Sequence, residues 1–176
     1  MRILKRHTRE LINLMTVAEY NKSVDLFSDN IFRFIVKNIN DIMKAEDIVQ
    51  DTYEKLWKRF EEISFEKVKS YLFTTAYHTM IDMIRREKKQ QSWDDSFENN
   101  SFESPEYDNI NEILHNALNK LPDSQKSVIM LRDYEGYSYN EIADITGLNE
   151  SQVKVYIYRG RLFLREYLEK HKISIL

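Results

Sequence analysis

The sequence predicts an all-α protein made of two small helical domains that a flexible acidic linker joins. Apolar residues recur at steps of three and four along most of the chain, which is the period of an amphipathic helix. Only three Gly and two Pro occur among 176 residues, so turn-rich β-sandwiches and barrels are poorly supported. Residues 90–116 hold seven acidic residues and no Lys or Arg, which separates them from two mildly basic ends.

The composition suits a folded soluble protein, because 42% of the residues are hydrophobic and 31% are charged. The absence of Cys excludes disulfides, thiolate zinc sites and a cysteine nucleophile, and it fits a reducing, cytoplasmic setting. No apolar run approaches the roughly 18 residues of a membrane span. The basic N-terminus lacks the apolar stretch of a signal peptide, so we expect no export.

Residues 1–20 are basic at first and then apolar, and we expect a helical extension there, ahead of a first domain over residues 21–89. A first helix is predicted over residues 23–39 and a second over residues 45–60, each with one apolar face. The apolar positions are Val24, Phe27, Ile31, Phe34 and Ile35 in the first helix and Ala45, Ile48, Val49, Thr52, Leu56 and Phe60 in the second.

The opposite face of the second helix is acidic. Its members follow each other at i, i+3, i+4 and i+7, and they are Asp47, Gln50, Asp51 and Glu54. Such a stripe is either a solvated surface or a docking face for a basic partner. A solvated surface is the more common case, and docking is the alternative because we expect Tyr53 and Trp57 to be exposed beside the stripe.

The third helix has the strongest period and runs for about five turns, from Val68 to Ile84. Its second face carries Thr74, Tyr77, His78, Ile81 and Arg85, and it leads directly into a basic cluster over residues 85–89. Aromatic rings beside cations can stack bases and neutralise the phosphates of single-stranded nucleic acid. The alternative is that the cations only complement the dipole at a helix C-terminus.

We predict a flexible linker over residues 90–108, which are rich in Ser and Asn, and a second domain over residues 109–176. Apolar periodicity predicts a helix that stops at Pro122, and a second helix over residues 124–134 with Val128, Ile129 and Leu131 inward.

A helix-turn-helix pattern follows. Ser138 and Glu141 have the spacing of a capping box, Gly147 suits a tight turn, and Asn149 can cap a long final helix. Ala143 is small where the two helices meet, and Val153 is apolar where the second must be pinned. The final helix then offers Ser151, Lys154, Val155, Tyr158, Arg159, Arg161 and Arg165 to solvent, as a major-groove helix does.

With these motifs, residues 20–89 and 110–169 resemble the extracytoplasmic-function (ECF) sigma factors of bacterial RNA polymerase. The stretch AEDIVQDTYEKLWK, residues 45–58, is similar to region 2.2, which docks on the β′ coiled coil of core polymerase. The resemblance implies core binding by Asp47, Gln50 and Asp51, with Glu54 on the same stripe. Residues 69–86 are similar to regions 2.3 and 2.4, which melt and capture the minus-ten element, so Tyr77, His78, Arg85 and Arg86 are the implied contacts. Tyr71 and His78 stand where the family usually has Trp and Asn.

Residues 121–143 resemble region 4, which reads the minus-thirty-five element and contacts the β flap. The resemblance places Lys154, Val155, Tyr158 and Arg159 at base edges, and Ser151 and Arg161 near phosphates. Val155 departs from the family, where many members have Ser.

The sequence therefore predicts a sigma factor, not an enzyme, that binds core polymerase and promoter DNA and promotes melting, without a cofactor. The resemblance also implies an anti-sigma factor, and an auxiliary DNA-targeting partner is a further hypothesis. A stand-alone helix-turn-helix regulator is the alternative, which the acidic stripe disfavours. A metal-dependent hydrolase is disfavoured because the four His residues lack paired ligand spacing.

Overall fold

The computed structural model describes residues 14–91 and 109–171, which are helical apart from short connections and contain no strand within those ranges. The chain divides into two compact units, residues 1–88 and 89–176. Residues 1–13 of the predicted extension at 1–20, and residues 92–108 of the predicted linker, lie outside the described residues. The linker was expected to start at residue 90, but Gln90 and Gln91 still belong to a helix.

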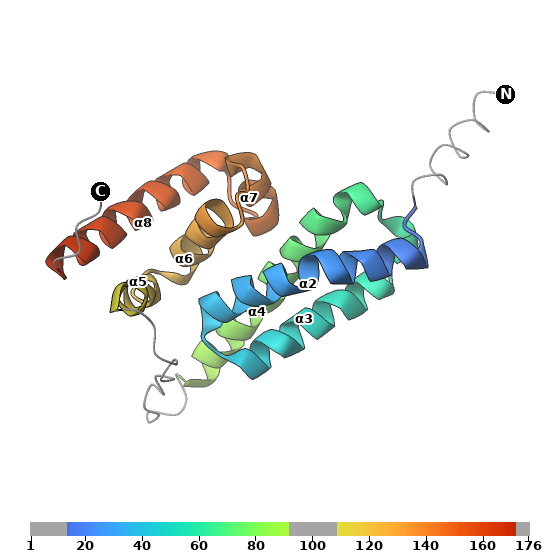
Figure 1. Ribbon diagram of the computed structural model, residues 1–176, viewed down its shortest axis with the longest axis horizontal. Helices are drawn as coiled ribbons and strands as arrows, with labels where there is room; N and C mark the ends of the chain where they lie inside the picture. The colour runs from blue at the N-terminus through green and yellow to red at the C-terminus, as the bar shows by residue number, and fades with distance from the viewer. Residues whose placement is uncertain (1–13, 92–108, 172–176) are drawn as a thin grey trace. The chain divides into compact units, whose positions relative to one another are not determined.

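Three long helices and one short 3₁₀ turn build the first unit (Figure 1). They are α2 (Val17–Ile39), α3 (Ile42–Trp57), the 3₁₀ turn Phe60–Glu62 and α4 (Phe65–Gln91). Thr16 and Glu19 form a capping box that starts α2, and the Asp41 side chain accepts a hydrogen bond from the Lys44 N–H to start α3. Asn40, in the left-handed conformation with φ 55°, ends α2 and allows the sharp reversal into α3.

The first unit begins earlier than residue 21, so the expected boundary there is wrong. Met15 is buried, and its N–H donates to the Ile63 carbonyl at 3.1 Å. The Tyr20 hydroxyl donates to the Tyr53 carbonyl at 3.2 Å. The Tyr20 ring packs edge-on to the Trp57 ring, with the ring centroids 5.0 Å apart. The start of α2 is therefore held by the C-terminal end of α3 and the turn that follows it.

The predicted apolar faces form the core of this unit, with Phe34 of α2 against Phe73 of α4 at 5.8 Å. The expectation that Tyr53 is exposed is wrong, because this ring is buried and its hydroxyl donates to the Ser23 carbonyl at 2.9 Å. Each helix packs against two others, so the buried arc is wider than one stripe of residues. Tyr53 lies at the edge of that arc, on the side that faces α2.

The second unit has the predicted helix-turn-helix (Figure 1). Ser138 and Glu141 form the capping box, Gly147 has φ 73°, and Asn149 and Gln152 form a further capping box. Val153 and Ile157 are buried, as expected for residues that pin the final helix. The elements are α5 (Asn109–Asn119), α6 (Asp123–Ile129) with a π-helical continuation Met130–Tyr134, α7 (Tyr139–Thr146) and α8 (Glu150–Lys170).

Gly160 sets how closely α8 approaches α6. It is buried, and a Cβ atom added to it would lie 2.2 Å from Cδ1 and 3.2 Å from Cγ1 of Ile129. Nothing in the apolar periodicity marks this position, because a glycine in a helix contributes no side chain to a stripe. The contact fixes α8 tightly against α6, one turn beyond Ile157.

Replacing Gly160 by Ala should lower the free energy of unfolding of the second unit by about 1–3 kcal/mol, because the methyl group overpacks the contact. Ile129→Val removes the Cδ1 atom, so the double variant should lose less than the sum of the single losses. Urea titration of the full chain, followed by the Gly147 amide signal in NMR, measures each loss. Strictly additive losses would contradict this packing.

Candidate polymerase-binding and promoter-binding surfaces

The acidic stripe lies on the exposed face of α3. All four members are exposed, while Ala45, Ile48 and Leu56 of the same helix are buried. The stripe therefore contributes nothing to the core and is accessible to a partner. Its four side chains are Asp47, Gln50, Asp51 and Glu54.

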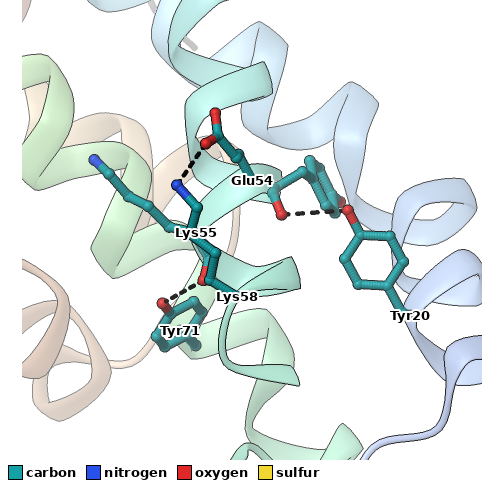
Figure 2. Close-up of polar contacts among 6 residues, drawn as sticks. Tyr20, Glu54, Lys55, Lys58 and Tyr71 are labelled. Carbon is teal, nitrogen blue, oxygen red and sulfur yellow. Dashed lines mark hydrogen bonds and ion pairs between the residues drawn. The ribbon is translucent and has the colours of Figure 1, made fainter. Parts of the chain in front are cut away.

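The four residues differ in their contacts within the chain. Lys58 Nζ donates to Glu54 Oε1 at 2.5 Å, and this hydrogen bond is the main reason why the pKa of Glu54 is lowered (Figure 2). Within the described part of the chain, Asp47, Gln50 and Asp51 make no hydrogen bond or ion pair. Their polar groups are therefore more available to a basic partner than the Glu54 carboxylate is.

Exposed apolar side chains stand at both ends of the same face. Trp57 is 48% exposed, as expected, and it stacks on Phe60 with the ring centroids 5.0 Å apart. Met43 is 76% exposed and lies one turn before Asp47. The sequence analysis missed Met43, although its i, i+4 spacing to Asp47 was a usable signal.

A groove with a volume of about 560 Å³ runs between α3 and α4. Lys55 Nζ spans it and donates to Thr79 Oγ1 at 2.8 Å, and Lys44 Nζ pairs with a Glu87 carboxylate oxygen at 2.7 Å. The groove thus brings two residues of the acidic stripe together with two of the predicted minus-ten residues. Its lining consists of Lys44, Asp47, Ile48, Asp51, Lys55, Thr74, Thr75, His78, Thr79, Asp82, Met83 and Arg86.

The predicted minus-ten residues on α4 separate into two groups. His78, Arg85 and Arg86 are exposed, and Arg85 pairs with Asp82 at 3.4 Å. Tyr77 is only 6% exposed, so the expectation that its ring lies on an open surface is wrong. This side of α4 is buried in the core of the unit. The Tyr77 ring packs edge-on to the His78 ring, with the ring centroids 5.3 Å apart. Tyr77 can support His78 but cannot stack on a base.

The predicted groove-entering residues lie on the N-terminal half of α8, and all are exposed. Lys154 pairs with Glu150 at 2.8 Å, and its Nζ lies 5.9 Å from the centre of the Tyr139 ring. Arg161 makes a two-pronged contact with the Asp133 carboxylate. In the described residues Arg159 has no such partner, which makes it the more available cation for a base edge.

Two arginine contacts that the sequence analysis missed brace the helix-turn-helix. The Arg132 guanidinium donates to the Tyr137 carbonyl at 2.7 Å and lies 4.9 Å from the centre of the Tyr139 ring. The Arg161–Asp133 pair joins α8 to the π-helical end of α6 across 28 residues of sequence. No local spacing predicts a pair so far apart in the chain.

The described residues contain no group of three or more His, Asp or Glu side chains that could hold a metal ion. None of the helices within them is long and apolar enough to cross a membrane.

Comparisons with known proteins match both units of the chain. The family model for sigma-70 region 2 matches residues 24–90, and the model for sigma-70 region 4 matches residues 111–164. RNA polymerase sigma factor SigV of Bacillus subtilis is 35% identical over 140 residues, which are 79% of this chain and 82% of that protein. ECF RNA polymerase sigma factor SigM of the same bacterium is 27% identical over 86% of this chain and 94% of that protein.

A solved structure of the sigma factor RpoE in complex with the anti-sigma factor NepR, from Bartonella quintana, has the same fold. The match has a TM-score of 0.76 and 25% sequence identity, and it covers 87% of this chain and 98% of that one. The two family models together span more than half of the chain. The chain belongs to the sigma-70 family of RNA polymerase sigma factors, in its ECF group, as the sequence motifs predicted.

The burial of Tyr77 can be tested by comparing how its replacement and that of the exposed His78 change stability. Tyr77→Ala should lower the free energy of unfolding of the first unit by about 3 kcal/mol or more, because it empties a core position. His78→Ala, at an exposed position, should change it by no more than about 0.5 kcal/mol. Urea denaturation followed by Trp57 fluorescence, in a Trp93→Phe background, measures both. Equal stabilities of the two variants would refute the core position of Tyr77.

Proposed function

We propose that this chain is an ECF sigma factor that binds core RNA polymerase through α3, directs it to promoters through α8 and helps to open the minus-ten element. The observation that carries the proposal is the presence in one chain of both sigma-70 region 2 and region 4. The polymerase supplies the catalysis, and the sigma factor supplies sequence recognition and strand separation. A stand-alone regulator would not need region 2, because it binds duplex DNA without core polymerase.

The polymerase contact is assigned to Asp47, Gln50 and Asp51. They are exposed on one face and make no polar contact within the described chain. A basic surface, such as the β′ coiled coil that the family resemblance implies, would complement them. Glu54 contributes less, because it must first give up its contact with Lys58. The β flap is the second polymerase contact, made by region 4.

The minus-ten contact is assigned to His78, Arg85 and Arg86, with Tyr77 as support for His78. The two arginines can neutralise phosphates of an opened strand, and His78 and Arg86 both line the groove. Opening costs about 1.4 kcal/mol per base-pair step of lost stacking, and contacts to the separated strand must offset this cost. In the major groove of the upstream element we place Ser151, Lys154, Val155, Tyr158 and Arg159, with Arg161 near the backbone.

We also propose that an anti-sigma factor regulates this chain and that it acts in the cytoplasm. The support is the similarity to the sigma factor RpoE in its complex with NepR, which spans most of both chains. The proposed location follows from the proposed binding partners, because RNA polymerase and the chromosome are cytoplasmic in bacteria.

In vitro transcription from a genomic library tests the proposal. The cognate core polymerase with the chain should start at a new set of sites that share an upstream element and a minus-ten element. Core polymerase alone should not start at these sites. A library in which the added chain creates no start sites would overturn the proposed function.

One prediction distinguishes the members of the acidic stripe from each other. Asp51→Asn should weaken binding to core polymerase about tenfold, which corresponds to about 1.4 kcal/mol. Glu54→Gln should weaken it less than about threefold, because Lys58 already occupies that carboxylate. The control is Asp25→Asn, which removes an exposed charge from α2 and should have no effect. Fluorescence anisotropy of the labelled chain measures the three affinities. A larger loss for Glu54→Gln than for Asp51→Asn would contradict the assignment.

Another prediction distinguishes base contacts from phosphate contacts on α8. Arg159→Ala should relax the preference at one upstream position by about 1–3 kcal/mol in a selection from randomised promoters. Lys154→Ala should relax the preference less, because Glu150 pairs with this lysine. Arg165→Ala should reduce occupancy without changing the selected sequence. Identical selected sequences for wild type and Arg159→Ala would rule out the base contact.

A further inference from the structure

An apolar row of side chains runs along the exposed face of α8. Val155 is 43% exposed and Tyr158 is 69% exposed, and Leu162 is also exposed one turn further on. Their spacing of three and four residues places them on one face of the helix. The buried residues Val153 and Ile157 lie on the other side of α8, so nothing in this unit's core accounts for the row.

Val155 lies in the half of the helix that enters the major groove in helix-turn-helix proteins. The two residues one turn before and one turn after it on the same face are Ser151 and Arg159. Neither makes a polar contact within the described residues. The neighbouring Lys154 side chain does not fold over Val155, because its ammonium group pairs with Glu150 and lies near the Tyr139 ring. The isopropyl group of Val155 therefore stands uncovered between two polar side chains.

We propose that Val155 packs against the C5-methyl group of a thymine in the upstream promoter element. This inference rests on the proposed function and adds a specificity-determining residue to it. In the major groove only thymine presents a methyl group, whereas cytosine presents an amino donor that an apolar side chain cannot satisfy. Val155 has no donor or acceptor in its side chain, so methyl contact is the form of readout open to it.

The upstream element should therefore contain a thymine beside the base that Arg159 reads. Burying one methyl group against an apolar side chain is worth about a fourfold difference in affinity. Tyr158 lies one turn away and is the next exposed apolar surface on the same face. Uracil, which differs from thymine only by the missing methyl group, is the matched probe.

The test uses the full chain with core polymerase on promoters taken from the genomic transcription experiment. Thymines of the upstream element are replaced one at a time by deoxyuridine, while the minus-ten region stays unmodified. One replacement should weaken the wild-type holoenzyme complex about fourfold. Val155→Ser should remove this difference between thymine and uracil, and Leu162→Ser should keep it. Because Val155 is exposed, its replacement by Ser leaves the core of the second unit intact.

Four results would overturn the inference alone: an upstream element without a shared thymine, no loss with any uracil, the same loss in Val155→Ser, or disappearance of the loss in Leu162→Ser. The second result, combined with weaker core binding by Val155→Ser, would assign the row to a protein contact instead. If wild type forms no chain-dependent complex on unmodified promoters, the proposed function fails and the inference fails with it.

Discussion

Each functional helix must bury one face in its own unit and leave the opposite face to a partner, and this constraint governs both halves of the molecule. In α3, Ala45 and Leu56 are completely buried while Asp47 and Asp51 remain exposed. In α8, Gly160 allows an approach to Ile129 that a Cβ atom would block, and this approach holds the opposite face outward. Binding residues can then vary without disturbing the packing that presents them.

Polar contacts inside each unit decide which charges remain available on those faces. Glu54 is paired with Lys58, Lys154 with Glu150, and Arg161 with Asp133. Exposed ion pairs of this kind stabilise a protein by about 0.2–1 kcal/mol each. They therefore weaken the binding of these side chains to a partner without preventing it. Fewer charged side chains are therefore available to a partner than the sequence motifs suggest. Asp47, Asp51 and Arg159 are more available than their paired neighbours.

Local patterns predicted much of this structure, and long-range contacts account for what they missed. The capping box at Ser138, the turn at Gly147 and the apolar faces were visible because each depends on residues within one or two turns. The burial of Tyr53 and Tyr77 depends on a second packing neighbour, which helical periodicity does not contain. The start of the first unit depends on a hydrogen bond from Met15 to Ile63, and the brace on α8 joins residues 28 positions apart.

The central claim is that this chain recognises and opens promoters only as part of a polymerase complex. The most direct measurement is the fluorescence of 2-aminopurine placed in the minus-ten region of a promoter, with the chain, with core polymerase, and with both. The account predicts a rise in fluorescence, which reports strand opening, only when both are present. Specific binding of the promoter duplex by the chain alone, with no further change when core polymerase is added, would contradict the account and indicate a stand-alone regulator.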